Sequence, residues 1–104
     1  MAARTSVHPL LLQARTYPFA TEICTRYADM DPYKHINNVA IAAIYEETRV
    51  ALLRSLVERH GNLERGGWLV AELQIRYFAE IPYPSTLQVT GAITHVGHSS
   101  IRFS

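Results

Sequence analysis

The sequence predicts an α+β fold in which one long helix is followed by strands that pair with one another. Three observations support this prediction. Residues 39–60 carry apolar side chains at intervals of three and four, as an amphipathic helix does. Residues 68–81 and 87–96 alternate between apolar and polar side chains, as strands with one buried face do. Because strands joined by short turns pair antiparallel, we expect an antiparallel sheet with the helix on one face.

The elements before the helix are a leader, a short strand and a polar loop. Residues 1–20 mix prolines and arginines without any period, and we expect an irregular N-terminal leader. Residues 21–27 have the content of a short strand. Residues 28–38 are rich in Asp, Pro and Asn, the residue types that form turns.

The helix is expected to begin near Val39, with Asn37 or Asn38 as its N-cap. Gly61 follows the last periodic residue and is suited to a left-handed C-cap. The predicted buried stripe consists of Ile41, Tyr45, Thr48, Leu52 and Leu56, and Ile44, Ala51 and Leu53 widen it.

Two prolines and one glycine delimit the later strands. Pro82 and Pro84 end the strand over 68–81, because proline lacks the amide that a strand ladder needs. Residues 97–99, which begin with Gly97, predict a hairpin turn into a further strand that starts at Ser100.

Composition argues against several classes of function. The 104 residues carry a formal net charge of +1, which gives no reason to expect a nucleic-acid or anionic-membrane partner. No apolar run approaches the ~20 residues of a membrane-spanning helix. Cys24 is the only cysteine, so no internal disulfide can form, and we expect it to be a small buried hydrophobe. These observations favour a cytoplasmic protein.

The loop before the helix concentrates the side chains that can carry chemistry. They are two carboxylates, an imidazole and two amides: Asp29, Asp31, His35, Asn37 and Asn38. At a helix N-terminus, unpaired backbone N–H groups and the helix dipole favour negative charge. A carboxylate there can act as general base or nucleophile, while the N–H groups stabilise an oxyanion. The alternative is local, since Asp and Asn are also common turn formers and caps.

The run Asp-Met-Asp-Pro-Tyr-Lys-His-Ile-Asn-Asn, residues 29–38, resembles the Asp-x-Asp-x-x-x-His-x-Asn-Asn signature of the hotdog-fold thioesterases. This family includes 4-hydroxybenzoyl-CoA thioesterase, bacterial long-chain acyl-CoA thioesterases and plant acyl-carrier-protein thioesterases. The Tyr-Glu-Glu-Thr-Arg run at 45–49 is part of the same resemblance. Residues 75–82 and 97–103 are similar to the family's second strand and to its hairpin into the fourth strand.

The resemblance implies a hotdog domain over residues 21–104, an antiparallel sheet wrapped around one long central helix. The family fold has a fifth strand, and we expect the C-terminal strand or strands to be lacking here. The resemblance also implies a homodimer or homotetramer with its site at the subunit interface.

The resemblance further implies the site and its chemistry. Asp31 matches the catalytic carboxylate, and His35 matches a histidine of the acyl-carrier-protein branch, although Tyr33 stands where that branch has an asparagine. The oxyanion amide falls within the range 36–38, which makes Ile36, Asn37 and Asn38 candidate substrate-binding residues, with Tyr77 as a candidate pocket residue. The implied reaction is hydrolysis of an acyl-CoA or acyl-carrier-protein thioester, without a metal or other cofactor.

Two other functions stay open from sequence alone. One is a hotdog module that binds an acyl thioester or a protein partner without hydrolysis. The other is a hydroxyacyl dehydratase, which places its histidine and acid differently. Glu46 and Glu47 could supply a helix-borne catalytic carboxylate or pair with an arginine such as Arg49. His95 and His98 lack an acidic or cysteine partner at metal-ligand spacing.

Overall fold

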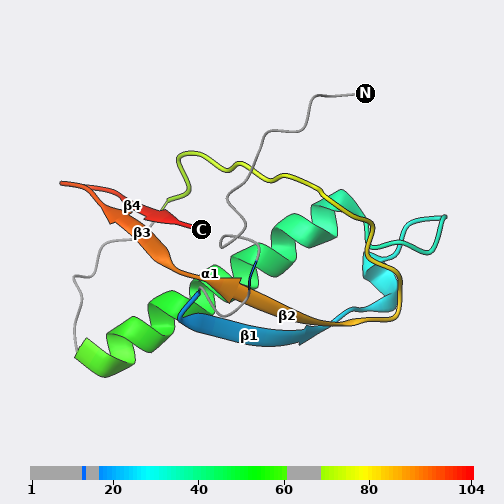
Figure 1. Cartoon of the computed structure of the whole chain (residues 1–104), viewed down its shortest axis with the longest axis horizontal. Coiled ribbons are helices and arrows are strands. Elements are labelled where there is room, and N and C mark those ends of the chain that lie inside the picture. Colours follow the sequence, from blue (N-terminus) through cyan, green and yellow to red (C-terminus); the bar gives the residue numbers. More distant parts are fainter. Residues whose placement is uncertain (1–12, 14–16, 61–68) are drawn as a thin grey trace.

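The computed structural model describes residue 13 and residues 17–60 and 69–104. Strand β1 (Phe19–Cys24) leads through a 3-10 turn, η3 (Tyr27–Asp29), and a loop into helix α1 (Asn38–His60). Strands β2 (Thr86–Gly91), β3 (Ile93–Val96) and β4 (Ile101–Phe103) follow. Figure 1 shows α1 crossing β1 and β2, which lie side by side. This is the predicted α+β arrangement, with one long helix packed on antiparallel strands.

The strands pair antiparallel throughout. β1 pairs with β2, with Phe19 opposite Gly91, and β3 pairs with β4. Between the two pairs, Ala92 and Ser104 exchange backbone hydrogen bonds of 2.8 and 2.9 Å. Residues 86–96 therefore form a nearly continuous strand that changes its partner at Ala92, which confirms the predicted strand over 87–96.

The predicted hairpin after this strand is also confirmed. The Gly97 amide donates to the Ser100 carbonyl at 2.7 Å, and Val96 lies opposite Ile101. A Cβ on Gly97 would stand 2.7 Å from the Ser100 hydroxyl oxygen, which can rotate away, and 3.4 Å from the Ser100 carbonyl oxygen, an ordinary contact.

The core lies between the start of α1 and the inner face of β1 and β2. Its most buried members are Ile36, Ala40, Ile41, Ile44 and Val89, and Ile23, Ile81, Tyr83 and Leu87 pack around them. Thr48 is buried too, and its hydroxyl shares a 2.8 Å hydrogen bond with the hydroxyl of Thr21 on β1. This bond joins the middle of the helix to the sheet.

The predicted helix stripe is confirmed at Ile41, Thr48 and Leu52 and is wrong at Tyr45, which is 45 % exposed. Ile44, expected to widen the stripe, is confirmed as a core residue. Successive helix residues are about 100° apart, so a face centred between the rows of Ile41 and Ile44 leaves position 45 at its edge.

The predicted strand over 68–81 is wrong over its described part, residues 69–81. Residues 69–80 run extended above the helix in Figure 1, and their backbone makes no hydrogen bond to another described segment. Leu69 is 93 % exposed, and Leu73 and Phe78 are also exposed. An alternating pattern identifies the two faces of an extended segment, but a strand also needs a neighbour with free ladder groups. The described part of the chain offers no such neighbour.

The first strand begins two residues and ends three residues earlier than predicted, so Phe19 and Ala20 belong to the sheet. Cys24 is exposed at the end of β1, because the strand's alternation turns it away from the helix, and its Sγ lies 3.8 Å from the Thr86 hydroxyl oxygen. The expected leader over 1–12 and 14–16, and the expected cap at Gly61, lie outside the described residues. Within those residues no helix is long and apolar enough to cross a membrane.

Truncating Ile44 should destabilise the protein, because this side chain fills the contact between α1 and the sheet. We expect Ile44→Ala to lower the free energy of unfolding by about 2–4 kcal/mol. Tyr45→Ala is the matched control and should cost about 1 kcal/mol or less, as surface substitutions usually do. Urea unfolding of the three proteins measures both values. Equal losses for the two variants would contradict this assignment of the buried face.

Candidate active site

The loop between β1 and α1 is anchored by the buried carboxylate of Asp29, which is 5 % exposed. One carboxylate oxygen accepts the Arg26 amide at 2.8 Å, and the other accepts the Arg26 guanidinium Nη2 at 2.9 Å. The hydrogen bond from the Arg26 side chain, followed by the one from its backbone, holds the pKa of Asp29 below its usual range. The same pairing raises the pKa of Arg26. Both oxygens of Asp29 are thus engaged in holding the η3 turn.

Asn37 fixes the start of α1. The backbone N–H of Asn37 donates to the Asp29 carbonyl at 2.9 Å. The side-chain oxygen of Asn37 accepts the backbone N–H of Ala40 at 2.7 Å. Its carbonyl accepts the Ile41 amide at 3.1 Å. The predicted N-cap at Asn37 is confirmed, because an Asn side chain that accepts a first-turn amide defines this position.

Asp31 sits at the base of a tight turn and is partly exposed. Its Oδ1 accepts the Tyr33 amide at 2.8 Å and the His35 amide at 3.0 Å. Its own amide donates to the His35 carbonyl at 2.7 Å. Lys34 closes the turn with a φ of 65°, in the left-handed region. These bonds orient the carboxylate through one oxygen, and among the described residues Oδ2 accepts no hydrogen bond.

Few amides at the helix start are available to a ligand. The Ile36 amide donates to the Ile81 carbonyl at 2.8 Å, and the Asn37 amide is bonded to Asp29. Within the predicted range of 36–38, only the backbone N–H of Asn38 has no partner among the described residues. The amide of Val39 is likewise unpaired, as expected in the first turn of a helix, where no intrahelical acceptor exists.

Two surface depressions meet at this point. The larger, of about 570 Å³, is lined by Arg26, Ala28, Asp29, Asp31, Asn37, Asn38, Val39, Ala40 and Ala43. The smaller, of about 300 Å³, is lined by Asp31, His35, Ile36, Asn38, Ile41, Tyr77, Phe78, Ala79, Glu80 and Ile81. Asp31 and Asn38 line both. A carboxylate and the first helical residue therefore stand between two hollows.

The extended segment after α1 contributes to the smaller depression. The Tyr77 hydroxyl donates to the Asn38 carbonyl at 3.3 Å. The His35 Nε2 lies 3.3 Å from a carboxylate oxygen of Glu80. Sequence reasoning did not single out Glu80, because no short spacing connects it to His35 and the pair forms only once the chain has folded back.

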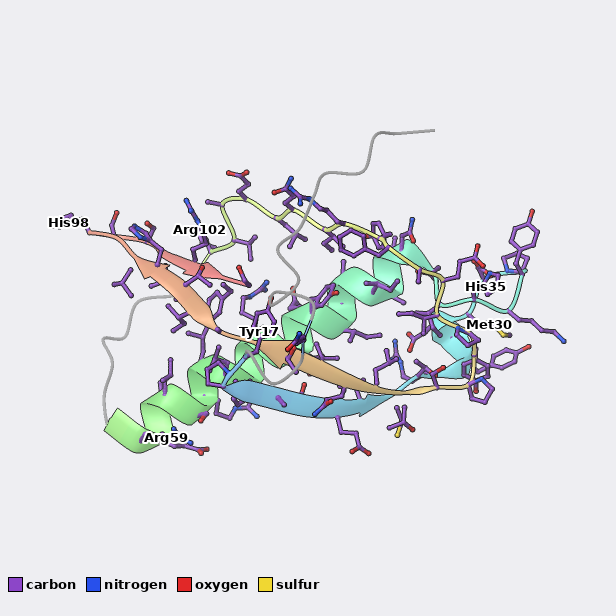
Figure 2. The ribbon with its side chains drawn as sticks, viewed as in Figure 1. Tyr17, Met30, His35, Arg59, His98 and Arg102 are labelled. Carbon is purple, nitrogen blue, oxygen red and sulfur yellow. The ribbon has the colours of Figure 1, made fainter. Side chains whose placement is uncertain are left out.

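The other candidates for chemistry lie elsewhere. Glu46 forms an ion pair with Arg49 at 3.5 Å, one of the arginine pairings considered from sequence. His95 lies on β3, and Figure 2 places His98 at the opposite end of the molecule from His35. Across residue 13 and residues 17–60 and 69–104, no three His, Cys, Asp or Glu side chains gather closely enough to hold a metal ion.

Comparisons with known proteins agree with this fold. A family model described as the thioesterase superfamily matches residues 33–104. A Pseudomonas aeruginosa protein of known crystal structure shares 30 % identity and a TM-score of 0.69, over 86 % of this chain and 63 % of that protein. A Xanthomonas campestris protein described as a candidate acyl-CoA thioesterase shares 26 % identity and a TM-score of 0.63, over 79 % of this chain and 69 % of that protein.

No curated protein matches the chain. The chain spans less than two thirds of the length of the Pseudomonas aeruginosa protein. Together with the observed layout, the matches confirm the expected hotdog fold, with one long helix against antiparallel strands.

The Asp29 anchor predicts a defined acid sensitivity. Its pKa is lower in the folded than in the unfolded chain, so the unfolded chain binds the proton more tightly. The ionised Asp29 carboxylate stabilises the folded protein fully above the pKa of Asp29 in the unfolded chain, about 3.9. This contribution to the free energy of unfolding is lost as the pH falls from there through the lower pKa of Asp29 in the folded chain. We expect Asp29→Asn to be less stable near neutral pH and to lose this acid-dependent component. Urea unfolding from about pH 7 to pH 3 measures it, with the exposed Glu58→Gln as control. An unchanged pH dependence in Asp29→Asn would contradict the anchoring role.

Proposed function

Because the chain belongs to the thioesterase superfamily, we propose that it hydrolyses an acyl thioester, with acyl-CoA as the substrate class, to a carboxylic acid and a free thiol. The observation that carries this proposal is the position of Asp31 and Asn38 between two depressions. A thioester has a reactive carbonyl with an acyl arm on one side and a thiol arm on the other. Two hollows that meet at a carboxylate and an unpaired amide suit such a molecule.

In the proposed reaction the substrate carbonyl oxygen faces the backbone N–H groups of Asn38 and Val39, which make no hydrogen bond within the described residues. These N–H groups stabilise the negative charge that develops on this oxygen during attack. The helix dipole adds to the effect, since the N-terminus of α1 carries partial positive charge. Preorganised donors of this kind often make the largest single contribution to rate enhancement in acyl transfer.

Asp31 is proposed to act through Oδ2, as general base or as nucleophile. As a base it takes a proton from water, the hydroxide adds to the carbonyl carbon, and the tetrahedral intermediate expels the thiolate, which then takes up a proton. As a nucleophile it displaces the thiolate to form an acyl-aspartyl anhydride, which water cleaves to the carboxylic acid and the restored carboxylate. In both routes the Tyr33 and His35 amides hold Oδ1, so Oδ2 is the oxygen left to react.

The remaining side chains are proposed to shape the smaller depression. His35 orients Asp31 through its backbone and offers its ring to the substrate, while Glu80 holds that ring from the facing segment. Ile36 and Tyr77 line the same hollow. The Asn37 amide is already bonded to Asp29, so Asn37 contributes by capping the helix whose amides bind the oxyanion.

Replacing Asp31 should abolish turnover while preserving the loop. In Asp31→Asn the side-chain oxygen can still accept the Tyr33 and His35 amides, but the amide group can neither take a proton nor attack. Loss of a general base typically lowers kcat by about 10²–10⁴-fold. A free-thiol assay over a panel of acyl-CoA and acyl-carrier-protein thioesters measures the loss and identifies the carrier.

Glu46→Gln and Glu47→Gln are the matched controls for Asp31→Asn, because they test a helix-borne carboxylate as the catalytic group. Both should retain wild-type turnover. An Asp31→Asn protein that keeps more than about a tenth of wild-type activity would rule out Asp31 as the catalytic group. A protein that binds acyl-CoA without releasing thiol would instead be the non-hydrolysing module.

We also propose that the active form is a homodimer or homotetramer. The segment beside the smaller depression exposes Leu69, Leu73 and Tyr77 at alternate positions, on one face, and this apolar surface suits a second copy. Activity should therefore fall on dilution as subunits separate, and light scattering at assay concentrations should report at least a dimer. An active monomer would contradict this prediction.

A further inference from the structure

The hydrogen bond from Tyr77 ends on a peptide group that carries one of the free amides. The Tyr77 hydroxyl donates to the Asn38 carbonyl at 3.3 Å. That carbonyl and the Val39 N–H belong to the same planar peptide, in which carbon, oxygen and nitrogen share one delocalised system. The Val39 N–H has no partner among the described residues, and Val39 is exposed and lines the larger depression, where a ligand could meet this N–H.

A hydrogen bond donated to the carbonyl oxygen of a peptide group makes the N–H of the same peptide group a stronger hydrogen-bond donor. Hydrogen bonds linked through one peptide polarise one another, by about 10–30 % per bond. The Asn38 carbonyl has two lone pairs and can accept both the amide one helical turn on and the Tyr77 hydroxyl. The second donor draws electrons from the nitrogen and makes the Val39 N–H a better donor.

The same bond fixes the peptide in space. Residues 69–80 have no backbone hydrogen bond to another described segment, and Tyr77 is the residue of this range whose side chain bonds to the start of α1. The hydroxyl therefore links this segment to the first turn of the helix at the edge of the smaller depression, which both Tyr77 and Asn38 line.

We propose that Tyr77 is a positioning residue that polarises and orients the Asn38–Val39 peptide, so that the Val39 N–H stabilises the oxyanion of a thioester under attack. The catalytic part of this inference rests on the proposed function. The polarisation itself is a property of the free protein and can be measured without any substrate.

The first test is the amide chemical shift of Val39 by nuclear magnetic resonance. Loss of the hydroxyl in Tyr77→Phe should move the Val39 amide proton and nitrogen upfield, because the amide becomes less polarised. Tyr45→Phe is the matched control, since this tyrosine is also on the surface and makes no described hydrogen bond through its hydroxyl. A Val39 resonance that moves equally in both variants, or in neither, would overturn the proposal.

The second test separates positioning from substrate contact. Tyr77→Phe should lower kcat about 3- to 10-fold with KM unchanged, because the interaction is strengthened only as charge develops on the carbonyl oxygen. A rise in KM with kcat unchanged would make Tyr77 a substrate contact and overturn the positioning role. If the wild-type protein hydrolyses no acyl thioester, the proposed function fails, and the Val39 shift alone decides whether Tyr77 polarises this peptide.

Discussion

The 2.7 Å hydrogen bond from the Ala40 amide to the Asn37 side chain determines where α1 begins, and the geometry of the site depends on that boundary. It engages the third amide of the helix and leaves the first two free. The Asn37 amide is in turn bonded to the carbonyl of Asp29, so the cap is tied to the η3 turn. A helix that began one residue later would present a different pair of backbone N–H groups to the depressions.

Two aspartates separated by a single residue have different physical roles. Asp29 is buried, engages both carboxylate oxygens with Arg26 and has a lowered pKa. Asp31 is partly exposed and is held through one oxygen by the turn that follows it. The first carboxylate therefore maintains the shape of the loop, and the second is the one accessible from both depressions. One backbone bond, from the Asp31 N–H to the His35 carbonyl, and one from the His35 N–H to Asp31 Oδ1 hold the Asp31 carboxylate in its orientation.

The features that sequence predicted correctly are those set by local signals. The helix over 38–60, its cap at Asn37 and the hairpin at Gly97 follow from periodicity and from the chemistry of single residues. Ile44, expected to widen the buried stripe, does lie in the core, whereas Tyr45 is exposed, because the rotation of the helix against the sheet decides which edge of a broad apolar stripe is covered. The contact between His35 and Glu80 and the unpaired state of residues 69–80 depend on which distant segments meet. The loop motif identified Asp31 and the helix start as candidates, but not which amides remain free.

The extended segment also bears on how the chain behaves in concentrated solution. An unpaired run with exposed leucine, valine and phenylalanine side chains is a template onto which another chain can add as a strand. Glu72 and Arg76 interrupt this run on one of its two faces, and charges placed in this way act as gatekeepers against aggregation. The face that carries Leu69 and Leu73 has no such charge, so solubility rests on whatever covers that face.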